Sequence, residues 1–112
     1  MIQWTTPTII WTFPVGTDFS DVVSMVCTLK QRDLIINKSF EELTIADNEV
    51  SFKLSQEESG KFFSNLIPPT LLNQHPNNIL VQLNWLYSDG NRGCSNIAVI
   101  EVNDNLFKEK ME

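Results

Sequence analysis

The fold is decided by the stretch Ile79–Tyr87, which reads ILVQLNWLY. Its apolar residues recur with the two-residue period of a β-strand, and Val81, Leu83 and Trp85 fall on one face. We therefore predict that these three side chains lie in the core. The polar residues between them are predicted to face outward.

A turn and a returning strand follow this stretch. Asp89-Gly90 is a strong hairpin signal, because glycine adopts positive φ at no steric cost. Cys94–Val102 then carries apolar residues on both of its faces, which is typical of a strand covered on both sides. The two strands are expected to form the strongest hairpin of the chain.

The hairpin also gathers apolar residues on its outer face. If Val81 pairs with Ile100 and Leu83 with Ala98, four apolar side chains surround two amides there. The residues of this candidate interaction face are Leu80, Gln82, Asn84, Leu86, Ile97 and Val99. Proteins usually cover such a patch, and amides supply hydrogen bonds within an interface. The pattern predicts self-association or docking on a partner, unless the proline-rich loop or the segment Leu106-Phe107 folds over the face.

Length and composition indicate one globular domain. The chain has 112 residues, of which 42% are hydrophobic and 20% are charged. We expect a single domain over residues 1–112, with a core over about residues 8–102 and a polar tail over 103–112. β-Branched and aromatic residues are plentiful, which favours strands over helices. The net charge of −6 argues against nucleic-acid binding, because phosphates are repelled by an acidic surface.

Further strands are predicted upstream of the hairpin. They are Thr8–Phe13, Val22–Gln31, Asp33–Lys38 and Val50–Leu54, with an irregular strand over Ser39–Ile45. Pro7 and Pro14 flank the first strand, and proline lacks the N–H of a central strand, so this strand is expected at an edge. The buried face of the second strand is predicted to be Val23, Met25, Cys27 and Leu29. Short strands separated by turn signals predict a β-sandwich of about seven strands.

One short helical turn is expected among the strands. Ser55 followed by Glu58 is a capping-box pattern, and the helix is expected to run to about Phe63. Asn65–Asn78 contains three prolines and is expected to cross the surface without regular structure. The tail after Val102 is expected to fray or to form a short helix.

No arrangement of residues indicates catalysis, a cofactor or a metal site. The single histidine, His75, lies in the irregular loop, and neither a second histidine nor a CxxC spacing is present to build a zinc site. A glycosidase would need two carboxylates that meet in the fold, and the sequence singles out no such pair. We therefore expect no enzyme activity, no cofactor and no metal.

The cysteines and the N-terminus indicate where the protein is kept. The first residues lack the basic region and apolar core of a signal peptide, and no apolar run approaches the roughly 20 residues of a membrane span. The chain is therefore expected in a cytoplasm, or to leave it by a route other than secretion. A disulfide between Cys27 and Cys94 that bridges two sheets is the alternative, but reduced, buried thiols are the expectation in that compartment.

Several fragments, taken in order, resemble a known family. They are Phe19-Ser20-Asp21, Thr28-Leu29-Lys30-Gln31, Leu54-Ser55-Gln56-Glu57-Glu58-Ser59, Val81-Gln82-Leu83, Asp89-Gly90 and Ser95. This order resembles the N-terminal domain of phage baseplate upper proteins and related small prophage proteins, over roughly Phe13 to Leu106. The chain differs from that family at Ser59, where threonine is expected, and in its proline-rich loop.

The resemblance implies an immunoglobulin-like antiparallel β-sandwich and a virion protein assembled in the cytoplasm of a bacterial host. Its expected partners are other tail proteins or further copies of itself, with no nucleic acid and no membrane. The alternative function is a carbohydrate-binding or adhesin-like module. Sugar stacking would need an aromatic platform, for which Trp4, Trp11 and Trp85 are the candidates.

Overall fold

The computed structural model describes residues 1–63, 78–103 and 105–112. In this part of the chain strands dominate. They are β1 (Thr8–Thr12), β2 (Val22–Gln31), β3 (Leu34–Lys38), β4 (Thr44–Ala46), β5 (Glu49–Lys53), β6 (Ile79–Tyr87), β7 (Arg92–Cys94) and β8 (Ala98–Ile100). A 3-10 helix, η1 (Phe40–Glu42), and a short helix, α1 (Gln56–Gly60), are the other described elements. His75 and the expected irregular stretch up to residue 77 lie outside the described residues.

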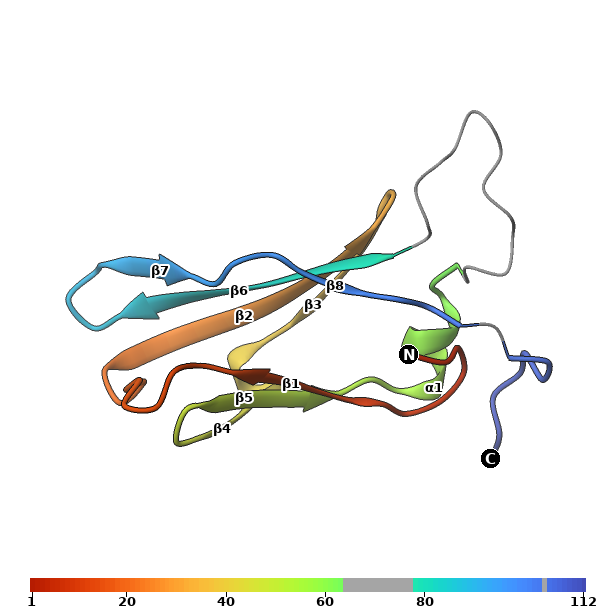
Figure 1. Cartoon of the computed structure of the whole chain (residues 1–112), viewed down its shortest axis with the longest axis horizontal. Helices are drawn as coiled ribbons and strands as arrows, with labels where there is room; N and C mark the ends of the chain where they lie inside the picture. Colours follow the sequence, from red (N-terminus) through yellow and green to blue (C-terminus); the bar gives the residue numbers. More distant parts are fainter. Residues whose placement is uncertain (64–77, 104) are drawn as a thin grey trace.

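Two antiparallel sheets are stacked on each other, with the larger sheet above the smaller in Figure 1. The smaller sheet has the strand order β1-β5-β4, and the larger has the order β3-β2-β6-β7, with β8 also paired to β6. In immunoglobulin-like sandwiches these are the positions of strands B, E and D and of strands C′, C, F and G. The predicted immunoglobulin-like antiparallel sandwich is therefore confirmed, and β1 lies at a sheet edge as expected. The described residues form eight strands where about seven were expected, and two short helical elements, η1 and α1, where one helical turn was expected.

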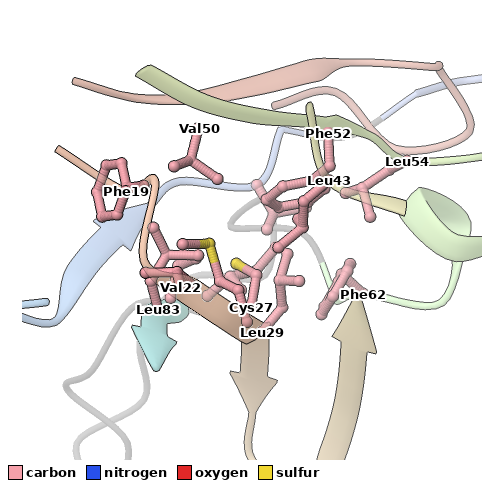
Figure 2. Close-up of a cluster of buried hydrophobic side chains, with 14 residues drawn as sticks. Phe19, Val22, Cys27, Leu29, Leu43, Val50, Phe52, Leu54, Phe62 and Leu83 are labelled. Atoms are coloured by element: carbon pink, nitrogen blue, oxygen red, sulfur yellow. The ribbon is translucent and has the colours of Figure 1, made fainter. Parts of the chain in front are cut away.

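The core lies between the two sheets, where side chains from both layers meet (Figure 2). Its buried residues include Phe19, Val22, Met25, Cys27, Leu29, Leu43, Val50, Phe52, Leu54, Phe62, Ile79, Val81, Leu83 and Val102. The prediction for Val81 and Leu83 is thus confirmed. Trp85 also faces inward but is only half-buried, because it closes one end of the core. Its ring centroid lies 5.8 Å from that of Phe13 and 5.7 Å from that of Phe19.

The predicted register of the hairpin is wrong. Val81 pairs with Ala98 rather than with Ile100, and Asn84 pairs with Cys94. Between these two pairs the segment that follows β7 has one residue more than β6. The single strand expected over 94–102 is therefore divided into β7 and β8. Ser95 lies between β7 and β8 and binds this segment to β6, because its hydroxyl accepts a hydrogen bond from the Leu83 N–H at 3.0 Å. The same hydroxyl donates a hydrogen bond to the Asn96 carbonyl at 2.8 Å. This irregularity is a β-bulge in its effect.

A second irregularity corrects the predicted buried face of β2. Met25, Cys27 and Leu29 are buried as expected, but Val23 is exposed and Val22 is buried in its place. The pairing of β2 with β6 shifts between Val22 and Ser24, and the shift reverses the alternation at the start of the strand. Periodicity alone carries no signal for such a shift.

The helical turns differ from the prediction in extent. The capping box at Ser55 and Glu58 is present, but α1 ends at Gly60 rather than near Phe63. The irregular strand expected over Ser39–Ile45 is instead η1 followed by the short strand β4, because Ser39 and Glu42 form a second capping box.

The C-terminal tail forms no helix in its described residues 105–112. It reaches α1, where the Gln56 side chain donates to the Met111 carbonyl at 2.9 Å and accepts from the Met111 N–H at 2.8 Å. At the other end of the chain, Ile2 forms a parallel bridge with Asn103. Both chain ends therefore lie at the α1 end of the sandwich, as Figure 1 shows.

Candidate interaction face

The outward side of the larger sheet carries the residues that the sequence singled out. The side chains of Leu80, Ile97 and Val99 are 44%, 59% and 58% exposed, and Leu86 is also exposed. Leu80 and Leu86 lie on β6, Val99 lies on β8, and Ile97 directly precedes β8. We call the outward side of β3, β2, β6, β7 and β8 the larger-sheet face.

The register extends this patch across the sheet. Lys30 of β2 pairs with Leu80 on one side and with Ile35 of β3 on the other, and Leu80 pairs with Val99. Ile35 is 53% exposed, so one row across the sheet holds three exposed apolar side chains and the stem of a lysine. Ile35 and Lys30 are not among the residues predicted from the sequence, although the alternation of β2 and β3, combined with their pairing, places them on this face.

Polar groups at the centre of the larger-sheet face are held in position by their neighbours. The Gln82 amide donates to the Ser95 carbonyl at 2.9 Å, and Arg92 donates to the Asn84 amide oxygen at 3.0 Å. Both amide side chains are half-buried. Among the described residues, the Gln82 oxygen and the Asn84 NH₂ have no partner, so each keeps hydrogen-bonding capacity for a docked surface.

Two shallow hollows lie on this face, on either side of Asn84. One has a volume of about 320 Å³ and is lined by Thr28, Lys30, Leu80, Val81, Gln82, Asn84 and Ile97. The other has a volume of about 290 Å³ and is lined by Ser24, Met25, Val26, Asn84, Trp85, Leu86 and Arg92. Both are open to solvent and mainly apolar, so they suit protruding side chains of another protein better than a small molecule that must be enclosed.

The larger-sheet face differs in charge from the whole protein. The chain has 14 acidic and 8 basic residues, yet the outward strand residues of this sheet include no carboxylate. They do include Lys30 and Arg92. The outward strand positions of this face therefore repel another acidic protein less than the net charge of −6 would suggest.

A buried lysine forms the main ionic cluster of the described structure. Lys38 lies 2.7 Å from Glu58 and 3.3 Å from Glu42, which are the two capping-box glutamates. Burial alone would lower the pKa of Lys38, but Glu58 and then Glu42 outweigh it, so the pKa is raised. Each partner is already engaged with a helix start, and the cluster therefore ties β3, η1 and α1 together rather than activating a nucleophile.

The two cysteines lie on opposite sides of the larger sheet and form no disulfide. Cys27 is buried, and burial raises the pKa of its thiol to about 11, against a smaller opposite effect of the Trp11 side chain. Such a thiol stays protonated at neutral pH and is a poor nucleophile. Cys94 is exposed on the larger-sheet face, which corrects the expectation that both thiols are buried.

The three tryptophans are engaged within the domain. The Trp11 ring is stacked at 6.3 Å from that of Phe13, and Trp85 joins the same aromatic cluster. Trp4 lies against Gly60 of α1, where any added Cβ would overlap its ring. None of the three combines with another into an exposed platform for a sugar ring.

No family model, no curated protein and no solved structure matches this chain. Within the described part, no three histidine, cysteine or carboxylate side chains lie close enough together to hold a metal ion. No helix among the described residues is both long and apolar enough to cross a membrane.

Proposed function

We propose that this protein is a non-enzymatic interaction module that docks on another protein through the larger-sheet face. Following the family resemblance, we place it in a phage or prophage virion, as a component of the tail tip or baseplate. The observation that carries the proposal is an exposed sheet face that combines an apolar row, oriented amides and two cations with no strand carboxylate.

The chemistry of the face defines the kind of partner. Leu80, Ile97 and Val99 supply an apolar centre, and complete burial of one such side chain contributes about 1.5–3 kcal/mol relative to full exposure. These side chains are already partly covered, so each would contribute less than this. The amides of Gln82 and Asn84 add direction, and Lys30 and Arg92 favour a neutral or acidic protein surface.

Two observations bear on the alternatives. The tail was one of the two segments expected as alternatives to cover the face. It is instead hydrogen-bonded to α1, and Leu106 is almost fully exposed. The tryptophans that a carbohydrate-binding module would use for stacking are packed within the domain. Specific binding in a glycan array would nevertheless favour the carbohydrate-binding alternative over docking on a tail protein.

The test is incorporation into particles. We expect the wild-type protein in purified virions of its phage, and we expect the double variant Leu80→Lys with Val99→Lys to be absent from them. The matched control is Thr44→Lys with Ala46→Lys, which adds the same charge to exposed positions of β4 in the other sheet. Circular dichroism establishes that both double variants fold.

Two results would contradict the proposal. One is a wild-type protein that is never found in particles and binds no purified tail component. The other is equal incorporation of both folded double variants, since the larger-sheet face would then be dispensable.

A further inference from the structure

The free edge of β1 presents a regular row of unpaired backbone groups. The Leu54 N–H donates to the Pro7 carbonyl at 3.0 Å, and the Phe13 N–H donates to the Asn48 carbonyl at 2.8 Å. These bonds fix the alternation, so that the backbone groups of residues 7, 9, 11 and 13 point toward β5. The N–H and C=O groups of Thr8, Ile10 and Thr12 therefore point away from β5, and within the described residues no backbone group pairs with them.

Apart from the flanking prolines Pro7 and Pro14, β1 lacks the features that usually protect an edge strand. Natural edges are short, interrupted or charged. Among the described edges, β3 carries the inward-pointing Lys38, β4 has three residues, and β7 and β8 are separated by an irregular gap. β1 reads TIIWT, has five residues, follows a single register with β5 and contains only strong strand formers without a charge.

We propose that this edge pairs with the same edge of a second copy of the chain. The two β1 strands run antiparallel, with Ile10 opposite Ile10 on the two-fold axis. This register places Thr8 opposite Thr12 of the second copy, and each of these pairs exchanges two backbone hydrogen bonds. The two smaller sheets then form one continuous six-stranded sheet, in the order β4-β5-β1-β1-β5-β4.

The side chains of β1 fit this self-pairing because the strand is nearly palindromic. On the outward side threonine meets threonine and isoleucine meets isoleucine, while on the inward side Ile9 meets Trp11 of the second copy. Threonine pairs and aromatic–β-branched pairs are favourable across an antiparallel ladder. Ile10 is 57% exposed, so the pairing covers an apolar side chain that the single chain leaves in water.

The neighbouring charges are also complementary in this register. In the single chain Thr8 is paired with Lys53 and Thr12 with Glu49. In the proposed register Thr8 lies opposite Thr12 of the second copy. The row of paired residues that runs through these two threonines, across both copies, ends in Lys53 of one copy and in Glu49 of the other. A protein with a net charge of −6 thus meets no like-charge pair across the new ladder.

This interface is separate from the larger-sheet face. It uses backbone groups at the edge of the smaller sheet, and its test does not depend on the proposed function. A dimer formed in this way would leave both larger-sheet faces uncovered.

Disulfide trapping tests the register. An Ile10→Cys variant in a Cys94→Ser background would place two thiols opposite each other, with a Cα separation of about 5.5 Å, which lies within the range of about 4.4–6.8 Å for a disulfide. We expect a covalent dimer on mild oxidation. The Thr8→Cys variant alone should give little covalent dimer. In a mixture of Thr8→Cys and Thr12→Cys chains, the two variants should cross-link to each other. Equal trapping of Thr8→Cys alone would contradict the register.

The oligomeric state provides the second test. We expect light scattering of the wild-type protein across a concentration series to show a dimer, and Ile10→Lys to give a folded monomer because it sets like charges on the two-fold axis. Thr44→Lys, on the outward side of β4, is the control that should remain dimeric. A wild-type protein that stays monomeric throughout, or an Ile10→Lys variant that still dimerises, would overturn the proposal.

Discussion

The Trp85 indole covers Gly93 on the neighbouring strand. The two residues are paired across the β6–β7 ladder, and a Cβ added to Gly93 would overlap the indole ring. The absence of a side chain at this position leaves the space that the ring occupies. From there it reaches Phe13 and Phe19 and closes the end of the core.

Gly93→Ala should therefore destabilise the domain by about 1–3 kcal/mol, as overpacking does. The ring must move, and the aromatic cluster moves with it. Urea unfolding measures the loss. In a Trp85→Phe background the same substitution should cost less, because the smaller ring leaves room at Gly93. Equal losses in the two backgrounds would show that the ring is not the obstacle.

Leu83→Ala should cost about 2–5 kcal/mol, because Leu83 is fully buried and the substitution leaves a cavity. Gln82→Ala, one residue away on the outward side, removes a hydrogen bond to the Ser95 carbonyl and should cost about 0.5–1.5 kcal/mol. Thermal unfolding of the two variants checks the difference. Similar losses would contradict the assignment of the two faces of β6.

Glu58 should make stability depend on acid pH. Burial alone would raise the pKa of Glu58. The hydrogen bond and the charge of Lys38, together with the hydrogen bonds from Ser55, outweigh burial, so the pKa is lowered. The stabilisation is then complete above the ordinary carboxyl pKa of the unfolded chain. It is lost as the pH falls through the lower pKa of the folded state, because the unfolded chain binds the proton first.

Glu58→Gln should accordingly cost about 1.5–3 kcal/mol at neutral pH and flatten the acid limb of the stability curve. The control is Glu57→Gln, whose partner Lys110 lies 3.3 Å away in an exposed pair. An exposed pair contributes at most about 1 kcal/mol. Melting temperatures between acid and neutral pH measure both. Equal acid limbs in the two variants would contradict the role of Lys38.

The two thiols should react at different rates. In the folded protein a thiol reagent should modify Cys94, which is exposed, while Cys27 should react only after unfolding because it is buried with a pKa of about 11. Mass spectrometry with and without denaturant counts the modified sites, and Cys94→Ser identifies which thiol reacted. A protein without a reactive thiol in denaturant would instead contain a disulfide.

The parts of the fold that the sequence predicts are those specified within a few residues. The alternation of Val81 and Leu83 defines a buried face, the spacing of Ser55 and Glu58 defines a helix start, and Pro7 indicates an edge strand. Each of these signals depends on local geometry, so each could be read without knowledge of the partner strand.

The parts that the sequence does not predict depend on pairing. The gap around Ser95 inserts one residue between β7 and β8, and the alternation of Cys94–Val102 looks equally plausible in either register. In the sequence, Lys38 is a lysine at the end of a strand, a position that is usually exposed. Its burial depends on its contact with Glu58, which lies twenty residues later in the chain. Likewise, the place of Ile35 on the larger-sheet face follows from its pairing with Lys30, which the sequence alone does not show.

The bridge between Ile2 and Asn103 has a mechanical consequence. The Gln3 N–H donates to the Asn103 carbonyl at 3.0 Å, and the Asn103 N–H donates to the Met1 carbonyl at 2.7 Å. Once the hydrogen bonds between Met111 and Gln56 have broken, tension applied through the two ends of the chain pulls the two parallel segments in opposite directions along their length. Such a load acts on these hydrogen bonds in shear and stretches them together, whereas a peeling load would break them one after another. The sandwich can therefore transmit force from one end of the chain to the other through this short contact before its core is loaded.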